Sequence, residues 1–422
     1  MTPVAELIAP RRLGRDFRWL LSSSWTSNLG DGIALAASPL LIASLTSSPL
    51  LVAAGAMMQF LPWLLFGLFA GSLADRVDRR RLVMIANASR AVVVSVLVVF
   101  LATGHITVWV VLATAFLYGT AEVFADTAGS TLLPMLVAPR DLGIGNARLQ
   151  AGFLVGNQLA GPPVGAFLFA LGSFWPFLVQ ILAVGLAVVL VSRIARTSIP
   201  EQDAAGDRDA HPIREGLRWL RTNAPVRSLV LIILVFNVTW AAPWSILVLY
   251  ATEHLQMGAV GFGALTTASA LGGLVGTTIF GRLERRLRFS TLMRICLTLE
   301  VLMHLGFALT TSPLVAFAIM FGFGLYAFVW GTISTTVRQR LVPLGLQGRI
   351  ASVNMVGIFA GLVVGQLLGG TIAQIWGLTA PWWFAFAGSA VTLALVWRTI
   401  SHIAAAPVAL GDADQAAERR ER

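Results

Sequence analysis

Twelve apolar segments of membrane-spanning length follow one another along the 422-residue chain. A helix rises about 1.5 Å per residue, so crossing about 30 Å of hydrocarbon takes roughly 20 residues. At 57% hydrophobic and 12% charged residues, the chain carries more apolar surface than a water-soluble fold can cover. The predicted spans are 19–44, 50–73, 82–103, 107–132, 145–170, 174–194, 228–250, 260–281, 290–310, 313–336, 350–375 and 379–399. The sequence therefore predicts an all-α membrane protein with twelve transmembrane helices.

The arginines predict the orientation of these helices. All 30 basic residues are Arg, and they lie in the N-terminal arm, the C-terminal tail, alternate connections, or span ends near those connections. Positive charge in short loops stays on the cytoplasmic side of a membrane. We therefore expect a multi-pass protein of the cell (inner or plasma) membrane with both termini in the cytoplasm. The net charge of +10 then reflects topology and contact with membrane lipid, and no nucleic-acid partner is expected.

The chain divides into two related halves joined by a linker. The predicted parts are a cytoplasmic arm (1–18), a six-helix half (19–195), a cytoplasmic linker (196–226), a second six-helix half (227–400) and a cytoplasmic tail (401–422). Within the linker, PIREGLRWLRTNA has the pattern of an amphipathic helix lying on the inner membrane surface. A shift of 204 positions aligns Gly161 and Gly165 with Gly365 and Gly369. Such repeats predict two pseudo-symmetric halves with a central site between them.

The connection after the second span carries a family motif. The segment G-S-L-A-D-R-V-D-R-R-R, residues 71–81, resembles the cytoplasmic loop motif of the major facilitator superfamily, with Asp78 in place of the family's second glycine. The resemblance implies the major facilitator fold and a cytoplasmic latch that closes the outward-facing state. The expected latch residues are Gly71, Asp75, Arg76, Arg79, Arg80 and Asp126. In that latch Asp75 would act on the start of the eleventh span near Arg349, and Arg79 would pair with Asp126.

The fifth span carries a second resemblance. Its segment G-N-Q-L-A-G-P-P-V-G, residues 156–165, is similar to the glycine and proline motif of the superfamily's drug and proton antiporters, with Gly161, Pro162 and Gly165 matching. Glycines four residues apart permit close helix contact, and proline allows a kink. A hinge is predicted here, with plain tight packing as the alternative. Nearly the whole chain looks like the branch that contains macrolide efflux pumps and the enterobactin exporter.

Ionisable residues inside the spans point to the mechanism. Asp31 lies in the middle of the first span and Glu122 in the middle of the fourth. Such groups are costly in lipid and by default functional. The fold implied by the resemblance places both at the central cavity, so we expect them to bind protons or another cation, with structural hydrogen bonding as the alternative. Arg90 in the third span is expected to extend towards the inner headgroups rather than to balance Asp31. For Glu300 and His304, which share a face of the ninth span, a buried polar pair or a packing contact is favoured over a proton relay.

Aromatic and polar residues on the four implied cavity helices form the expected substrate surface. They are Trp25, Asn28, Tyr118, Asn237, Trp240, Trp244, Tyr326 and Trp330. Such a lining suits a bulky, partly hydrophobic ligand. No G-x-S-x-G, H-E-x-x-H or phosphate-loop string occurs, so no enzyme, metal or cofactor site is predicted. The sequence thus predicts a monomeric, proton-coupled exporter of bulky amphipathic small molecules such as drugs, macrolides or siderophores. Proton-coupled uptake, facilitated transport and a non-transporting receptor are the alternatives.

Overall fold

The computed structural model describes residues 11–74, 76–195 and 212–405, which form helices and no strand. They belong to two compact units. The first comprises Met1–Ala205 and Ser245–Ala270, and the second comprises Gly206–Trp244 and Leu271–Arg422. The segment 245–270, which lies in the predicted second half, therefore packs with the first unit.

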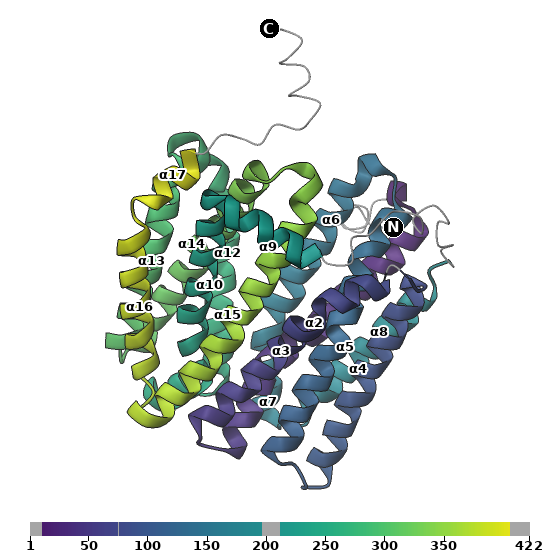
Figure 1. The fold of residues 1–422 in the computed structure, drawn as a ribbon. Coiled ribbons are helices and arrows are strands. Elements are labelled where there is room, and N and C mark those ends of the chain that lie inside the picture. Colours follow the sequence, from purple (N-terminus) through teal and green to yellow (C-terminus); the bar gives the residue numbers. More distant parts are fainter. Residues whose placement is uncertain (1–10, 75, 196–211, 406–422) are drawn as a thin grey trace. The chain divides into compact units, whose positions relative to one another are not determined.

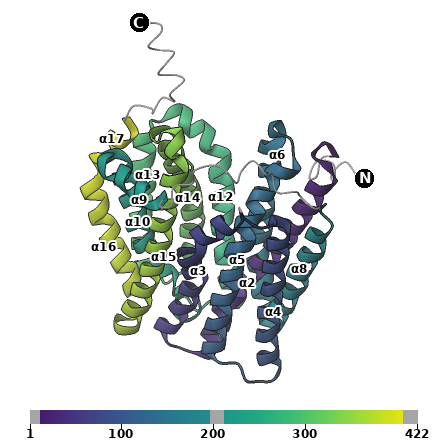
Figure 2. The ribbon, with the colours of Figure 1, turned by 45° about the vertical axis from the view of Figure 1, so that its right-hand side comes forward.

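In the first unit, α4 packs against both α5 and α8, while α2 packs against α7 and α8 (Figures 1 and 2). The elements are η1 (Arg11–Leu13), α2 (Gly14–Leu45), α3 (Pro49–Ala74), α4 (Arg79–Ala102), α5 (Val108–Leu136), η2 (Pro139–Asp141), α6 (Leu142–Gly152), η3 (Phe153–Ala160), α7 (Gly161–Leu171), α8 (Trp175–Ser192), α11 (Leu247–Leu249) and η5 (Tyr250–His254). The π-helical η3 joins α6 and α7 into one span-length helix.

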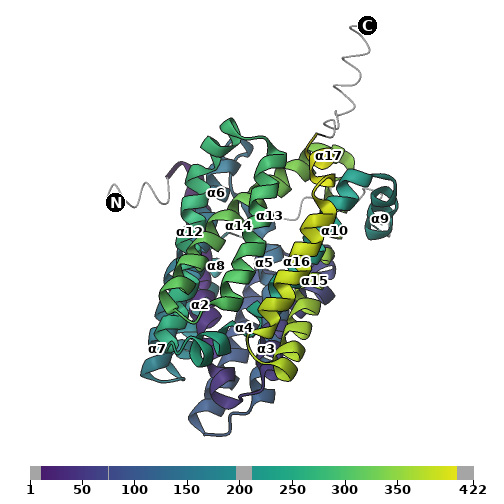
Figure 3. The same ribbon diagram turned by 90° about the vertical axis from the view of Figure 1, so that its left-hand side faces the viewer.

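In the second unit, α10 packs against α15, and α13 packs against α14 and α16 (Figure 3). Its elements are α9 (Pro212–Thr222), α10 (Ala224–Trp244), α13 (Phe289–Leu309), α14 (Pro313–Leu341), η6 (Leu344–Leu346), α15 (Gln347–Trp376), α16 (Ala380–Val396) and α17 (Thr399–Ala405). The long α12 (Ala259–Arg286) begins in the first unit and ends in the second.

Each predicted span corresponds to one helix, except that the fifth corresponds to the consecutive α6, η3 and α7 and the seventh extends beyond α10. Within the described ranges, 11 helices are long and apolar enough to cross a membrane, and α16 is a shorter apolar helix that completes twelve. The predicted all-α, twelve-helix class is confirmed. The predicted seventh span, 228–250, is wrong at its end, because α10 stops at Trp244 and is followed by the short α11 and η5. Pro243 lies in the last turn of α10 and has no N–H to contribute to a helical hydrogen bond there.

The predicted hinge segment lies in very close contact with α2. A β-carbon on Gly161 would lie 2.4 Å from the Cα of Gly32, and one on Gly165 would lie 2.1 Å from the carbonyl oxygen of Ile33. The backbones therefore touch without intervening side chains. The π-helical turns of η3 end directly before Gly161 and Pro162. Proline cannot donate the next helical hydrogen bond, and π-helical turns are frequent at functional sites.

The predicted linker helix forms as α9. Gly216 brings it against α15, where an added β-carbon would lie 3.0 Å from the carbonyl oxygen of Arg349 and 2.9 Å from a methyl group of Val353. Leu220 is buried, whereas Leu217 is exposed. Its location on a membrane surface remains a prediction.

Candidate functional site

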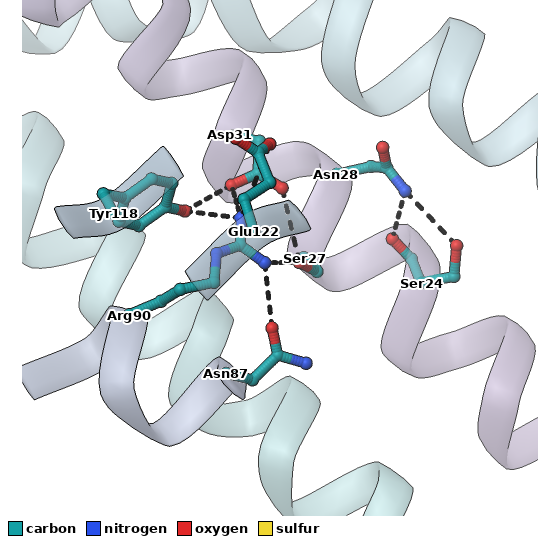
Figure 4. Close-up of polar contacts among 8 residues, drawn as sticks. All are labelled: Ser24, Ser27, Asn28, Asp31, Asn87, Arg90, Tyr118 and Glu122. Atoms are coloured by element: carbon teal, nitrogen blue, oxygen red, sulfur yellow. Dashed lines mark hydrogen bonds and ion pairs between the residues drawn. The ribbon is translucent and has the colours of Figure 1, made fainter. Parts of the chain in front are cut away.

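The first unit contains an arginine buried in the middle of the helix bundle. Arg90 on α4 is 1% exposed. One of its terminal nitrogens donates to Asn87 Oδ1 at 2.8 Å and to Ser27 Oγ at 3.1 Å. The other donates to the hydroxyl of Tyr118 at 2.6 Å and to Asp31 Oδ1. Figure 4 shows these side chains converging on the guanidinium from three helices, α2, α4 and α5.

Asp31 on α2 is held by three donors. Its Oδ1 accepts hydrogen bonds from Arg90 and from the Tyr118 hydroxyl, and its Oδ2 accepts one from Ser27 Oγ at 3.3 Å. The Arg90 guanidinium also lies over the Tyr118 ring, 4.5 Å from its centroid. Charge-assisted hydrogen bonds of this kind are stronger than neutral ones. The arrangement fixes Asp31 as the primary counter-ion of Arg90.

Glu122 is the second carboxylate at this arginine. It lies one turn after Tyr118 on α5, and its Oε1 is 3.9 Å from a terminal nitrogen of Arg90. Its side chain is 27% exposed, against 12% for Asp31. With both carboxylates ionised and Arg90 charged, the three groups carry one net negative charge. A proton or a ligand cation can balance that charge.

The expectation that Arg90 extends towards the headgroups is wrong. The helix that carries it begins at Arg79, so Arg90 lies eleven residues, about 16 Å, from that end. At this depth α2 and α5 supply two carboxylates and a phenol, whose contacts offset part of the cost of burying the guanidinium. The sequence reasoning also missed Asn87 and Ser27. Asn87 lies three residues before Arg90 on the same helical face, a spacing that could have indicated a polar partner.

The latch residues are only partly as predicted. Asp75 lies outside the described residues. Arg79 donates from Nε to the carbonyl of Ala74 at 3.3 Å, and its Nη1 lies 3.1 Å from the Sδ of Met135. Asp126 is nine residues before Met135, about 13 Å away along α5. The predicted pair of Arg79 with Asp126 is not found among the ion pairs of the described part of the chain, and Asp126 is exposed one turn after Glu122.

Two other residues of the loop motif stabilise helix ends. Arg80 donates to the carbonyls of Val191 at 3.2 Å and of Ser192, at the C-terminus of α8, where a cation is favourable. Asp78, which replaces the family's second glycine, is the N-cap of α4 and accepts a hydrogen bond from the backbone N–H of Arg81 at 3.0 Å. Its φ of −58° needs no glycine. The substitution is thus explained by capping.

Two of the expected substrate residues in the first unit make contacts within it. The indole of Trp25 donates to the carbonyl of Arg148 at 3.1 Å, and a β-carbon on Gly152 would lie 2.3 Å from the Trp25 ring. Asn28 donates to the carbonyl of Ser24 at 2.7 Å. Trp25 therefore contributes to helix packing, while the third residue, Tyr118, belongs to the Arg90 cluster.

In the second unit the expected substrate residues include an aromatic group. Trp240 and Trp244 stack with ring centroids 4.8 Å apart, and Phe323 lies 4.7 Å from Trp244. Both tryptophans are half-buried, as is Trp330. Asn237 donates to the carbonyl of residue 233 at 2.7 Å.

The last of these residues, Tyr326, is directed towards α13. Its hydroxyl donates to Glu300 Oε2 at 2.9 Å, and Glu300 Oε1 lies 3.3 Å from His304 Nε2. Glu300 and His304, which both lie on α13, are buried, so the predicted buried polar pair is found. Over the described ranges, no group of three or more His, Cys, Asp or Glu side chains could hold a metal ion.

Comparison with known proteins shows the family to which this chain belongs. The model of the transmembrane secretion effector family matches residues 7–420. The multidrug efflux pump Tap of Mycolicibacterium fortuitum is 27% identical over 379 residues, which cover 86% of this chain and 90% of the pump. Macrolide efflux protein A of Streptococcus pyogenes is 25% identical over 380 residues, covering 85% and 89%.

Solved structures show the same fold at lower identity. The nucleoside transporter NupG superposes with a TM-score of 0.71 at 12% identity, covering 92% of this chain and 99% of NupG. A bacterial homologue of the iron transporter ferroportin, in an inward-facing state, gives 0.73 at 17% identity, covering 93% and 99%. The chain therefore belongs to the transmembrane secretion effector family of the major facilitator superfamily and is a multi-pass membrane transporter, not an enzyme.

Proposed function

We propose that this transporter exports bulky amphipathic molecules in exchange for protons, by alternating access. The observation that supports this most directly is the sharing of one buried guanidinium by Asp31 and Glu122. Asp31 receives three hydrogen bonds, whereas Glu122 is more distant from Arg90 and more exposed. Leaving the second carboxylate ionised and uncompensated at this depth is unfavourable. Glu122 therefore takes up a proton first, and Asp31 is the fixed counter-charge.

Exchange follows from competition for this charge. A protonated Glu122 leaves the cluster neutral, and an ionised Glu122 leaves one negative charge that a cationic group of a substrate can balance. A transporter that must hold either a proton or a substrate cation exchanges one for the other. Inward movement of protons then drives outward movement of substrate.

The substrate class is inferred from two sources. The relatives are named as a multidrug and a macrolide efflux pump, which supports export of bulky molecules. The half-buried Trp240 and Trp244 offer stacking faces to a ligand with a flat apolar part. We therefore propose amphipathic molecules with a basic nitrogen and an aromatic or macrocyclic body.

Orientation and gating complete the proposal. The arginine distribution supports an orientation with both termini in the cytoplasm. We propose that the transporter acts as a monomer in the cell membrane. The loop of Gly71, Asp75, Arg76, Arg79 and Arg80 then lies on the cytoplasmic side as a latch, and Gly161, Pro162 and Gly165 form a hinge next to α2. Asp126, one turn from Glu122 and exposed, is reassigned from the latch to the path by which protons reach Glu122.

Proton release tests the coupling. Everted vesicles with an acidic interior are expected to lose their pH gradient when a macrolide or a cationic dye is added, because substrate entering the lumen displaces protons outward. Asp31→Asn and Glu122→Gln should abolish this response, since each leaves the cluster unable to alternate between proton and cation. Asp141→Asn, a carboxylate paired with Arg12 at the end of the bundle, is the matched control and should respond normally. A normal response in both cluster variants would refute the coupling role.

The aromatic group gives a separate prediction. Trp244→Ala is expected to weaken binding of an aromatic cationic dye about three- to tenfold, because one stacking partner is worth about 0.5–1.5 kcal/mol. Binding is measured by fluorescence anisotropy on purified protein whose melting temperature is unchanged. Trp376→Ala, which removes a tryptophan that is 70% exposed in the same unit, is the control. Equal affinities in the two variants would exclude the stack as a binding surface.

A further inference from the structure

The second unit contains a buried acid–base pair to which the proposed exchange cycle assigns no role. We propose that Glu300 and His304 together bind and release one proton, forming a second proton-binding site. The pair lies on α13, one helical turn apart, with His304 Nε2 3.3 Å from Glu300 Oε1. This site is separate from the Arg90 cluster, because every residue of that cluster belongs to the first unit.

The pair is buried among aromatic side chains. His304 is 0% exposed and Glu300 is 9% exposed. The ring of Trp382 on α16 lies 6.2 Å from the His304 ring, and Trp382 is itself fully buried against Phe307. Within the described ranges, the hydroxyl of Tyr326 is the one hydrogen-bond donor to Glu300 apart from His304, at 2.9 Å.

Among the described residues, no other cationic side chain lies close enough to Glu300 to balance its charge. The other ionisable groups on α13 and on the helices packed against it are Arg294 and Cys296 on α13, Tyr326, Arg338 and Arg340 on α14, and His402 on α17, while α16 has none. Arg294 is six residues, about 9 Å, from Glu300, and it is bonded to the carbonyl of Trp397 and to Ser401. Both arginines of α14 are at least twelve residues, about 18 Å, beyond Tyr326. None of these cations reaches Glu300.

Burial then dictates that the pair carries one proton. An ionised Glu300 beside a neutral imidazole would be an uncompensated charge in an apolar site. One added proton makes the pair neutral in either form, as imidazolium with carboxylate or as imidazole with carboxylic acid. Histidine exchanges protons near physiological pH. When the environment of α13 changes and water reaches the pair, the proton can leave.

Tyr326 connects the pair to the aromatic group proposed to bind substrate. Its ring packs edge-on against Phe323, with centroids 5.6 Å apart, and Phe323 lies against Trp244. A ligand that displaces Phe323 therefore disturbs the hydroxyl that donates to Glu300. The geometry thus links occupancy of the aromatic group to proton binding at Glu300 and His304.

Histidine NMR on the full-length purified chain tests the site directly. The chain has 5 His residues, and with ¹³Cε1-labelled histidine the His304 signal is the one lost in His304→Gln. That signal is expected to change with pH as the pair binds and releases its proton. Glu300→Gln should weaken proton binding by His304 about tenfold or more, because the carboxylate that stabilises the imidazolium is removed. Cys296→Ala, one turn before Glu300 on the same helix, is the control and should leave the titration unchanged.

The His304 signal can be assigned even if His304→Gln misfolds. Should His304→Gln not fold, single substitutions of the other four histidines, His105, His211, His254 and His402, assign the His304 signal by elimination. A His304 signal constant over the whole pH range, or an unchanged midpoint in Glu300→Gln, overturns the proposal. The titration needs neither substrate nor gradient, and Asp31→Asn should retain it. Failure of proton exchange at the first unit is therefore distinguishable from failure here.

Discussion

Arg90→Gln is expected to cause a large loss of thermal stability together with a complete loss of transport. The substitution removes the guanidinium to which Asp31, Glu122 and Tyr118 are directed, and it leaves the two carboxylates without a cation. Removing one partner of a buried pair typically costs about 3–5 kcal/mol. The measurement is the melting temperature of the purified protein in detergent, followed by size-exclusion chromatography, alongside transport in everted vesicles.

A second substitution separates charge from packing. Asp31→Asn in the Arg90→Gln background removes one of the unbalanced carboxylates, so the double variant should recover a large part of the lost stability without recovering transport. Tyr118→Phe is the matched control, because it removes one donor to Asp31 and leaves every charge in place. It should lower the free energy of unfolding by only about 1 kcal/mol, the contribution of a single hydrogen bond. A double variant no more stable than Arg90→Gln would show that charge balance is not what Arg90 contributes.

The fold was largely predictable from the sequence because lipid imposes a simple pattern. Each span had to be about 20 apolar residues, and only helices satisfy their own backbone hydrogen bonds there. The predicted helix starts therefore lie close to those observed, as for the second span, predicted at 50 and observed at Pro49. The end of α10 was missed because the residues after Trp244 are as apolar as those before it, and hydropathy does not register a break in the backbone.

The carboxylates of the site could be predicted from the sequence, but the side chains with which they pair could not. Asp31 and Glu122 stood out because carboxylates inside spans are rare. Arg90 was not predicted to be the partner of Asp31, because a long side chain can point inward or towards either end of its helix, and spacing along one helix does not decide between these directions. Likewise, Arg79 and Asp126 were joined by the family pattern, whereas the side chain of Arg79 reaches Met135. Pairing between helices depends on rotation about each helix axis, which a single sequence does not specify.

The glycines aligned by the 204-residue shift show the repeat in three dimensions. In the second unit, a β-carbon on Gly365 would lie 2.4 Å from the carbonyl oxygen of Val238 on α10, and one on Gly369 would lie 1.9 Å from that of Ala242. These contacts reproduce those of Gly161 and Gly165 with α2. In each unit a span of the same rank thus packs its glycines onto the backbone of the unit's first span. The first unit alone adds π-helical turns beside the contact, since α15 is a continuous helix.

Gly165→Ala and Gly369→Ala are therefore expected to reduce transport severely, and valine at either position to abolish it. The added carbon meets a backbone carbonyl, which cannot move aside as a side chain can, so the two helices must separate. Overpacking of this kind costs about 1–3 kcal/mol. Gly185→Ala and Gly331→Ala, whose added carbons would meet nothing within 4 Å, are matched controls and should keep full activity.

The same variants decide between a hinge and simple packing. If the contact only stabilises each unit, melting temperature and transport should fall together, and by similar amounts at Gly165 and Gly369. If the π-helical turns beside Gly161 make the first unit the moving element, Gly165→Ala should lose more transport than Gly369→Ala for the same decrease in melting temperature. We expect the second result, because a helix that can convert between π and α turns shifts its neighbour's register, whereas the uninterrupted α15 offers no such adjustment. Equal losses at both positions would reduce Gly161, Pro162 and Gly165 to packing residues.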